Sequence, residues 1–297
     1  MLLREFKDIF NYQQRFTKRF AEHDFHNVFE KTIRDLRRFG FAGLDGKKVL
    51  DLGCGQRYPF ALICAAHGAK VTALDINYIK PDPLPMAFYR IMLHNGFKRA
   101  VKSVLRRVVY DKNYYDILEN ISGKRLRQFS STITFAIGDP KSENYELPSN
   151  EYDLIVSNAV IEHVSDVTKF AKEVSRMLVQ GGFFYGIIHN FYSLSGGHNM
   201  EWAYPDEFPS SRVPPWDHLR KNLYPTFVYL NRLRPEEYYA AFANHLKVLL
   251  FEGRDINHDP GGFEGERFLT EEIKNELSMF KRDLLLTRSF CIICQKV

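Results

Sequence analysis

The segment Val49-Leu50-Asp51-Leu52-Gly53-Cys54-Gly55 joins a short apolar run to a glycine turn. Residues 49–52 hold one carboxylate among apolar side chains, which is typical of a strand buried on both faces of a parallel sheet. Gly53 and Gly55 allow the backbone to turn sharply and to approach a ligand that a Cβ would exclude. The segment therefore predicts a strand followed by a ligand-binding turn.

The residues after the turn complete a nucleotide-binding pattern. Residues 59–68 have a helical signature, with Pro59 near the start and Gly68 just past the end. A second apolar run follows and ends in Asp75. This position lies about 20 residues after the glycines, where a nucleotide-binding βαβ unit places the acid that binds ribose hydroxyls. The order predicts an α/β domain that binds a nucleoside.

A glycine-rich turn also fits a dinucleotide-binding domain. Dinucleotide enzymes have a longer Gly-x-Gly-x-x-Gly loop, which seats a pyrophosphate at a helix N-terminus. Here the loop is shorter and follows Asp51. A carboxylate at that point repels a pyrophosphate and suits a ligand that carries an ammonium group.

Three further motifs follow in order. Residues 137–139 read Ile-Gly-Asp, residues 152–164 predict a fourth strand with its turn, and residues 178–186 carry a Leu-x-x-Gly-Gly pattern. With the glycine turn, these motifs resemble those of the class I S-adenosylmethionine-dependent methyltransferases. The resemblance implies S-adenosylmethionine as the cofactor. It also implies an α/β, Rossmann-like fold, in which a seven-stranded, mostly parallel sheet has helices on both faces, an antiparallel final strand, and here helical and loop insertions.

The same resemblance implies roles for individual residues. The glycines would approach the methionine portion, Asp51 would order the loop on its ammonium side, and Asp75 would bind the ribose hydroxyls. Asp139 is expected at the adenine edge, and Asn158 at the tip of the fourth strand. The expected cofactor-binding residues are Asp51, Gly53, Gly55, Asp75, Asp139 and Asn158.

One position departs from the family pattern. Members often carry a third glycine two residues after the second, where this chain has Arg57 followed by Tyr58 and Pro59. We therefore expect the helix to start differently, and the family's roles are not carried over to residues 56–58.

The chain of 297 residues is long for one α/β domain and short for two, so we expect one core with sizeable insertions. Residues 1–45 carry apolar side chains at three- and four-residue spacing and predict two amphipathic helices. They would form a helical cap that either covers the cofactor or simply packs on the core. The methyltransferase core would span residues 46–297.

The first insert covers about residues 80–130 and is expected to be helical from Met86, after Pro81, Pro83 and Pro85. Residues 81 to 130 hold ten Lys and Arg against four Asp and Glu, a surplus that alone accounts for the formal net charge of +5. Four interpretations stay open: a solvated face, or contact with an anionic small acceptor, RNA or an anionic membrane surface.

The second insert covers about residues 190–235 and is rich in Gly, Pro, Trp, Tyr and His. Loops this long inside a domain are usually functional. This one leaves the C-terminal end of an expected strand, where ligands bind in open α/β folds. Trp202, Tyr204 and Trp216 suit stacking on a sugar face or an apolar ring. The insert therefore predicts a substrate loop for a small molecule.

A hydroxyl acceptor must lose its proton, and a neutral imidazole is suited to accept it near pH 7. Three histidines are candidates for this catalytic base: His189 at the end of the fifth strand, His163 after the fourth, and His198 in the second insert. Their spacings match no recognised metal-ligand pattern, so no metal site is predicted.

The leading functional prediction is O-methylation of a small molecule or sugar, possibly an anionic one. RNA methylation and a non-catalytic, S-adenosylmethionine-binding regulatory protein are the alternatives. A charged N-terminus and the lack of a long apolar run predict a cytoplasmic protein without a membrane span, although peripheral membrane contact stays open. The oligomeric state is not predicted.

Overall fold

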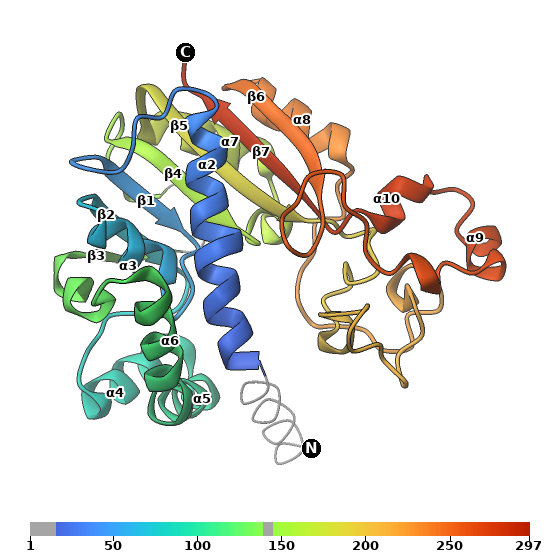
Figure 1. Ribbon diagram of the computed structural model, residues 1–297, viewed down its shortest axis with the longest axis horizontal. Coiled ribbons are helices and arrows are strands. Elements are labelled where there is room, and N and C mark those ends of the chain that lie inside the picture. The colour runs from blue at the N-terminus through green and yellow to red at the C-terminus, as the bar shows by residue number, and fades with distance from the viewer. Residues whose placement is uncertain (1–15, 139–144) are drawn as a thin grey trace. The chain divides into compact units, whose positions relative to one another are not determined.

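The computed structural model describes residues 16–138 and 145–297. Its strands form a seven-stranded sheet in the order β3-β2-β1-β4-β5-β7-β6 (Figure 1). Strand β1 pairs in parallel with β2 and β4, and β2 with β3, whereas β7 pairs antiparallel with β5 and β6. The Rossmann-like sheet with an antiparallel final strand is therefore confirmed. The strands are β1 (Lys48–Leu52), β2 (Lys70–Asp75), β3 (Thr134–Ile137), β4 (Tyr152–Asn158), β5 (Leu178–His189), β6 (Lys247–Arg254) and β7 (Ser289–Gln295).

Helices alternate with these strands along the chain. The α-helices are α2 (Lys31–Arg37), α3 (Pro59–Ala66), α4 (Leu84–Asn95), α5 (Phe97–Arg106), α6 (Lys112–Ser122), α7 (Val167–Met177), α8 (Pro235–Ala243), α9 (Glu271–Glu276) and α10 (Arg282–Leu286). Two π-helical turns, η1 (His23–Glu30) and η2 (Arg107–Asp111), and short 3-10 helices, among them η3 (Leu126–Thr132) and η4 (Ile161–His163), complete the set. No helix in the described ranges is long and apolar enough to cross a membrane.

The chain divides into two compact units. One comprises Met1–Ser142 and Glu151–Val156, and the other comprises Glu143–Asn150 and Ser157–Val297.

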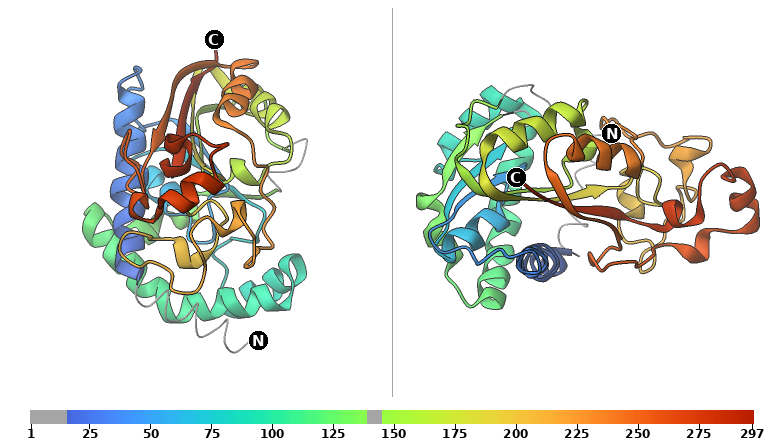
Figure 2. Two further views of the ribbon diagram at one scale, coloured as in Figure 1. Left: turned by 90° about the vertical axis from the view of Figure 1, so that its right-hand side faces the viewer. Right: turned by 90° about the horizontal axis from the view of Figure 1, so that it is seen from above.

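In the first unit, residues 16–37 form one uninterrupted helical run, drawn in blue in Figure 2. The two expected helices are thus continuous where the structure describes them, and Phe6, Ile9 and Phe10 of the first lie outside the described residues. Buried Phe29 packs on Phe60 of α3, with ring centroids 5.8 Å apart. The amphipathic face therefore lies against the helix that follows the glycine turn.

The first insert is helical, as predicted, and forms several short helices (Figure 1). Helix α4 begins at Leu84 rather than at Met86 because Pro85 lies in its first turn, where the missing N–H costs no hydrogen bond. Gly96, with φ 83°, separates α4 from α5. Strand β3 starts at Thr134, shortly after η3 ends at Thr132.

In the second unit, β6 and β7 run side by side, drawn in orange and red in Figures 1 and 2. Phe184 of β5 stacks on Phe242 of α8 with ring centroids 5.1 Å apart, and Phe170 of α7 packs edge-on against both. The second insert has little regular structure beyond two 3-10 turns, Met200–Trp202 and Asp217–Leu219. Cys291 and Cys294 on β7 are buried free thiols.

Candidate functional site

The glycine turn lies at the C-terminal end of β1. Gly53 and Gly55 have φ values of 82° and 69°, a region that L side chains rarely adopt. The amides of Gly53 and Cys54 both donate to the carbonyl of Leu74, at 2.8 and 3.1 Å. These bonds join the turn to the end of β2, so both glycines are needed for its shape.

Asp75, the last residue of β2, forms a hydrogen bond with the same turn. It is 7% exposed, and its Oδ2 accepts from the amide of Gly55 at 3.0 Å. Its Oδ1 accepts from the backbone and side-chain amides of Asn77 at 2.7 and 2.8 Å. Ile137 is paired with Asp75 across the sheet and is 41% exposed, and Ile76 is 48% exposed. Asp75 therefore has one exposed aliphatic residue next to it in sequence and another next to it in the sheet.

Asp51 is a buried carboxyl group on β1. It is 3% exposed, and its Oδ2 accepts from the amide of Ala61 in the first turn of α3, at 3.2 Å. Burial, opposed by that amide and reinforced by the charges of Asp75 and Asp24, raises the pKa of Asp51 to about 7. A cationic group next to Asp51 would favour its ionised form.

The position that lacks the third family glycine is an anchor for the first insert. Arg57 Nε donates to Asp111 Oδ1 at 2.7 Å, and both side chains are nearly buried, at 13% and 10% exposure. The guanidinium also lies 4.5 Å from the ring centroid of Tyr114 on α6. Tyr58, with φ 38°, is the residue before α3, which starts at Pro59. Residues 56–58 thus connect the glycine turn to both α3 and the first insert.

The neighbouring residues extend this anchor. Arg106 donates from Nε to Asp111 at 3.1 Å and from Nη1 to Gln56 Oε1 at 2.5 Å, while Gln56 also donates to Ser103 Oγ at 3.0 Å. The hydroxyl of Tyr114 donates to Asp24, in the N-terminal helical run. Arg106, one of the basic residues of the first insert, therefore forms its contacts within the first unit.

Two further residues, Asp139 and Asn158, were expected to bind the cofactor. Asp139 lies outside the described residues. Asn158 ends β4, and its Oδ1 is buried without a hydrogen-bond partner in the described ranges. A buried, unsatisfied amide oxygen is unusual in a folded protein and marks a position that suits a ligand.

The three candidate histidines lie together in the second unit. The ring centroids of His189 and His198 are 4.6 Å apart, and those of His163 and His198 are 5.0 Å apart. His163 Nδ1 is 2.9 Å from the carbonyl of Tyr229. Three segments distant in sequence thus bring these imidazoles to one place.

The loop that carries His198 is tightly folded. A Cβ on Gly196 would lie 2.1 Å from the carbonyl oxygen of Phe191, and one on Gly197 would lie 2.7 Å from the ring of His218. His198 itself has φ 55°, a costly conformation for a residue with a side chain. The close packing around Gly196 and Gly197 maintains this backbone conformation and so the position of the imidazole.

Burial keeps these imidazoles neutral. It lowers the pKa of His189 well below its usual range, and the positive charge of Arg288 adds to the effect. Burial, helped by His163, lowers the pKa of His198 to about 4. Near pH 7 both rings therefore carry a lone pair, as either a base or a metal ligand requires.

Glu162 lies beside the histidines. It is 1% exposed, and its Oε1 is 4.0 Å from His198 Nε2. Burial raises the pKa of Glu162 to about 8, against the smaller effect of the backbone amides of Glu162 and His189. These two amides lie outside hydrogen-bond geometry, and neither carboxyl oxygen forms a hydrogen bond with any residue that the structure describes.

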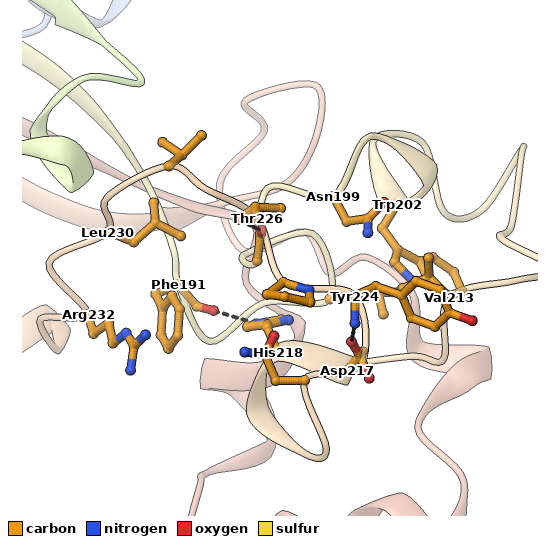
Figure 3. Close-up of a pocket in the computed structure, with 15 residues that line it drawn as sticks. Phe191, Asn199, Trp202, Val213, Asp217, His218, Tyr224, Thr226, Leu230 and Arg232 are labelled. Carbon is orange, nitrogen blue, oxygen red and sulfur yellow. Dashed lines mark hydrogen bonds between the residues drawn. The ribbon is translucent and has the colours of Figure 1, made fainter. Parts of the chain in front are cut away.

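A separate pocket is formed by the second insert (Figure 3). It holds about 570 Å³ of space, part of which is open to solvent. Arg232 lies 5.2 Å from the ring centroid of Phe191 at one end, while Trp202 and Val213 line the other (Figure 3). His218 Nε2 is 2.8 Å from the carbonyl of Phe191. The walls therefore combine aromatic, amide and cationic groups.

One aromatic residue of the insert is placed differently from the expectation. Trp216 is fully buried, and its Nε1 donates to the carbonyl of Tyr192 at 3.2 Å. It packs among aliphatic side chains such as Leu194 and Leu285. Trp216 is therefore a core residue that has no face available for stacking on a sugar, whereas Trp202 lines the pocket.

Several residues of the site were not predicted. Asn231 donates to the carbonyls of Ile161 and Val164, at 2.9 and 3.0 Å, and so holds the turn that carries Glu162. Glu264 accepts hydrogen bonds from Ser195, which contacts His189, and from Arg288. These residues are isolated polar side chains in loops or at strand ends, so their sequence carries no periodic or motif signal.

Comparison with known proteins identifies the family of the chain. A family model described as "Methyltransferase domain" matches residues 25–222, more than half of the chain. Comparison with curated proteins finds no match.

Solved structures with a similar fold include two bacterial enzymes and one archaeal complex. An S-adenosylmethionine-dependent methyltransferase from Mesorhizobium loti is 16% identical, with a TM-score of 0.47, over 88% of this chain and 96% of that one. A Haloferax volcanii methyltransferase in complex with the Trm112 activator is 16% identical, with a TM-score of 0.48, over 96% of both chains. Geranyl diphosphate C-methyltransferase from Streptomyces coelicolor is 13% identical, with a TM-score of 0.47, over 94% and 83%.

Proposed function

The chain belongs to the S-adenosylmethionine-dependent methyltransferase family, and from this membership we propose that it methylates an oxygen atom of a small molecule or sugar. The methyl group leaves the sulfonium of S-adenosylmethionine by in-line displacement, and S-adenosylhomocysteine is the second product. Much of the acceleration comes from holding the acceptor oxygen in line with the methyl group.

Most of the residues that we propose for cofactor binding lie in the first unit. In our proposal Gly53 and Gly55 border the methionine portion, and Asp75 binds the ribose hydroxyls with the lone pairs that Gly55 and Asn77 leave. The exposed faces of Ile76 and Ile137 suit an apolar purine ring beside that carboxylate. Asp51 is assigned to the ammonium side. The roles of Asp139 at the adenine edge and of Asn158 at the tip of β4 are carried over from the family resemblance.

The observation that carries the acceptor class is the pocket in the second insert. Its walls are aromatic at Phe191, Trp202 and Tyr224, and polar at Asn199 and His218. A mixed lining of this kind suits a small molecule with hydroxyl groups better than a phosphodiester chain. We therefore assign about residues 190–235 to acceptor binding, and about residues 80–130 to a helical support of the glycine turn.

An anionic acceptor is favoured by Arg232. Its guanidinium lines the pocket, stacks on Phe191, and has no carboxylate partner within the described residues. A cation placed over an aromatic ring retains its hydrogen-bond donors for a phosphate or carboxylate group. We propose that Arg232 contacts such a group on the acceptor.

The proton of the acceptor hydroxyl requires a base, for which we propose one of His189, His163 and His198. His189 and His198 are neutral near pH 7, which a base must be, although burial lowers the pKa of both rings and so makes both weaker proton acceptors. Replacing each with Gln and measuring turnover at saturating cofactor tests the assignment. Full activity in all three variants across pH 6 to 9 would remove the base from the mechanism.

The function is tested by turnover with S-adenosylmethionine that carries a labelled methyl group. Pools of sugars and their phosphates, phenols, carboxylic acids and RNA are offered separately. We expect label in a small, oxygen-containing acceptor, with the mass gain of one methylene. Label in RNA alone would favour the alternative of an RNA methyltransferase, and binding of the cofactor without transfer to any pool would favour a regulatory protein.

The remaining assignments are proposals of the same kind. We assign residues 1–45 to a helical cap and residues 46–297 to the core, and we place the reaction in the cytoplasm, as the free thiols suggest. Limited proteolysis of the cap and fractionation of cells that express the chain test these assignments. Secretion of the chain would contradict the second.

A further inference from the structure

The group formed by Glu162, His189 and His198 has the chemistry of a metal site. Each residue offers one ligand atom, and these atoms all lie within 4.8 Å of one another. Bonds of about 2.0–2.2 Å to a tetrahedral ion place neighbouring ligand atoms about 3.4 Å apart, so small side-chain rotations would close the group around an ion. Sequence spacing does not reveal the group because its members come from η4, the end of β5 and the second insert.

Glu162 provides an independent indication of a ligand. Its carboxyl group is 1% exposed, both oxygens lack a hydrogen-bond donor among the described residues, and Oε1 points to within 4.0 Å of His198 Nε2. A buried carboxyl group without partners costs several kcal/mol when it is charged. Near neutral pH the group avoids that cost by staying protonated, and a bound cation would instead stabilise its ionised form.

The contacts of His189 fix which of its nitrogens is available. Ser195 Oγ donates to Glu264 Oε1 at 2.6 Å, so the same oxygen accepts from His189 Nε2, 3.0 Å away. Arg288 in turn donates to Glu264 Oε2 at 2.5 Å. The proton of the neutral ring is therefore on Nε2, and the lone pair is on Nδ1. A hydrogen-bond network of this kind is typical of histidines that bind a metal ion through one ring nitrogen and donate to a polar group from the other.

We propose that Glu162, His189 and His198 bind one divalent transition-metal ion. Two neutral imidazoles and a carboxylate suit Zn²⁺, Fe²⁺ and related ions, whereas Mg²⁺ and Ca²⁺ prefer sites made of oxygen atoms. Three protein ligands leave at least one coordination position for a water molecule or a substrate oxygen. With the ion bound, His189 and His198 cannot also accept a proton, so the base role falls to His163.

The unmodified chain provides the first test. After treatment with a chelator and dialysis, the full-length protein is titrated with Zn²⁺ in a calorimeter and with Co²⁺ in a spectrophotometer. We expect one ion per chain, visible Co²⁺ absorption typical of four or five ligands, and binding of Mg²⁺ at least about a hundredfold weaker than that of Zn²⁺. Failure to bind Zn²⁺ or Co²⁺ at one ion per chain would overturn the proposal.

Substitutions then locate the ion. Glu162→Gln, His189→Gln and His198→Gln should each weaken Zn²⁺ binding at least tenfold, and Ser195→Ala, which frees His189 Nε2, should weaken it about tenfold. His245→Gln is the matched control, because this histidine belongs to the same unit but not to the group. Wild-type affinity in all three ligand variants would place the ion elsewhere and contradict the proposal.

The metal proposal and the methyltransferase proposal fail in different ways. Zn²⁺ titration requires neither cofactor nor acceptor, and it remains decisive on the wild-type chain even if a variant does not fold. Circular dichroism identifies any such variant. A chain that binds S-adenosylmethionine but no Zn²⁺ refutes the metal site alone.

Discussion

Asp75 has two roles in this account: it accepts a hydrogen bond from the glycine turn, and it is proposed to bind the ribose. Its mutation is therefore expected to affect both. Asp75→Ala removes a charge-assisted acceptor for the ribose hydroxyls, worth roughly 1.5–3 kcal/mol per hydrogen bond, and also releases Gly55 and Asn77. We expect S-adenosylmethionine to bind at least tenfold more weakly in isothermal titration. Asn77→Ala serves as the control, because it removes a side-chain bond to Asp75 but leaves the carboxylate. Equal loss in both variants would mean that Asp75 acts only through the loop.

Asp51 predicts a pH dependence of stability in the absence of cofactor. Its pKa is raised in the folded chain to about 7 from an unfolded value near 3.8, so the unfolded chain loses this proton first as the pH rises. The contribution of Asp51 is therefore fully present below about pH 4 and is lost progressively up to about pH 7, by about 4 kcal/mol in total.

Asp51→Asn isolates this effect because the amide oxygen still accepts from Ala61 and does not ionise. Urea unfolding at pH 5 and pH 8 should show a smaller loss of unfolding free energy in the variant than in the wild type. Parallel pH profiles for the two proteins would show that Asp51 is not perturbed.

Arg232 is expected to act on the acceptor and not on the cofactor. Arg232→Gln should raise KM for an anionic acceptor at least tenfold, since one charge-assisted contact is lost, while the Kd for S-adenosylmethionine stays unchanged. The matched control is Arg282→Gln, whose guanidinium is exposed, is paired with Glu266 and does not line the pocket. An unchanged KM in Arg232→Gln would leave the acceptor without its proposed anion contact.

At the scale of elements, the first insert is attached to the glycine turn through a few buried polar side chains. Arg57→Ala would remove the ion pair with Asp111 and the contact with Tyr114, although Arg106 would still pair with Asp111. We expect a loss of about 2 kcal/mol, which is less than for a buried carboxylate left entirely unpaired. Limited proteolysis should then cleave within residues 81–130 before other parts of the chain.

Arg127→Ala is the control for the insert. Arg127 pairs with Asp116 and Glu119 from an exposed position on the same insert, so its loss should cost less than about 1 kcal/mol. If Arg57→Ala and Arg127→Ala have equal thermal stability and equal protease sensitivity, the network around Arg57 does not hold the insert.

The elements that sequence predicted are those with a strong local signal. The apolar runs that became β1, β2, β4, β5 and β7 identify buried strands, and Pro59 with Gly68 marks the ends of α3. Helix ends in the insert were less accurate, because Pro85 is compatible with a first turn as well as with extended chain.

Only those site residues that belong to a sequence motif could be predicted from the sequence. Gly53, Gly55 and Asp75 follow the spacing of the family motif, and the structure places Gly55 and Asp75 in hydrogen-bond contact, while their cofactor roles stay predictions. The partners of Arg57 and the chain from Arg288 to His189 depend on contacts between segments far apart in sequence. Such contacts leave no periodic pattern, and the burial of Trp216 shows that composition alone does not separate a ligand-facing aromatic residue from a core residue.

At the scale of the whole molecule, family membership establishes methyl transfer, while the acceptor and the metal are separate proposals about the second unit. The three parts can be measured independently: cofactor binding through the glycine turn, acceptor binding through the pocket around Arg232, and ion binding through Glu162. A failure in one measurement would leave the other two standing.

Isothermal titration of S-adenosylmethionine and of S-adenosylhomocysteine into the full chain tests the central claim most directly. One binding site per chain is predicted for each ligand, with competition between the two and with affinity reduced at least tenfold in Asp75→Ala. NADH, whose pyrophosphate the loop at Asp51 should repel, is predicted not to bind. Binding of NADH, or no heat from either S-adenosyl ligand with a folded chain, would contradict the account.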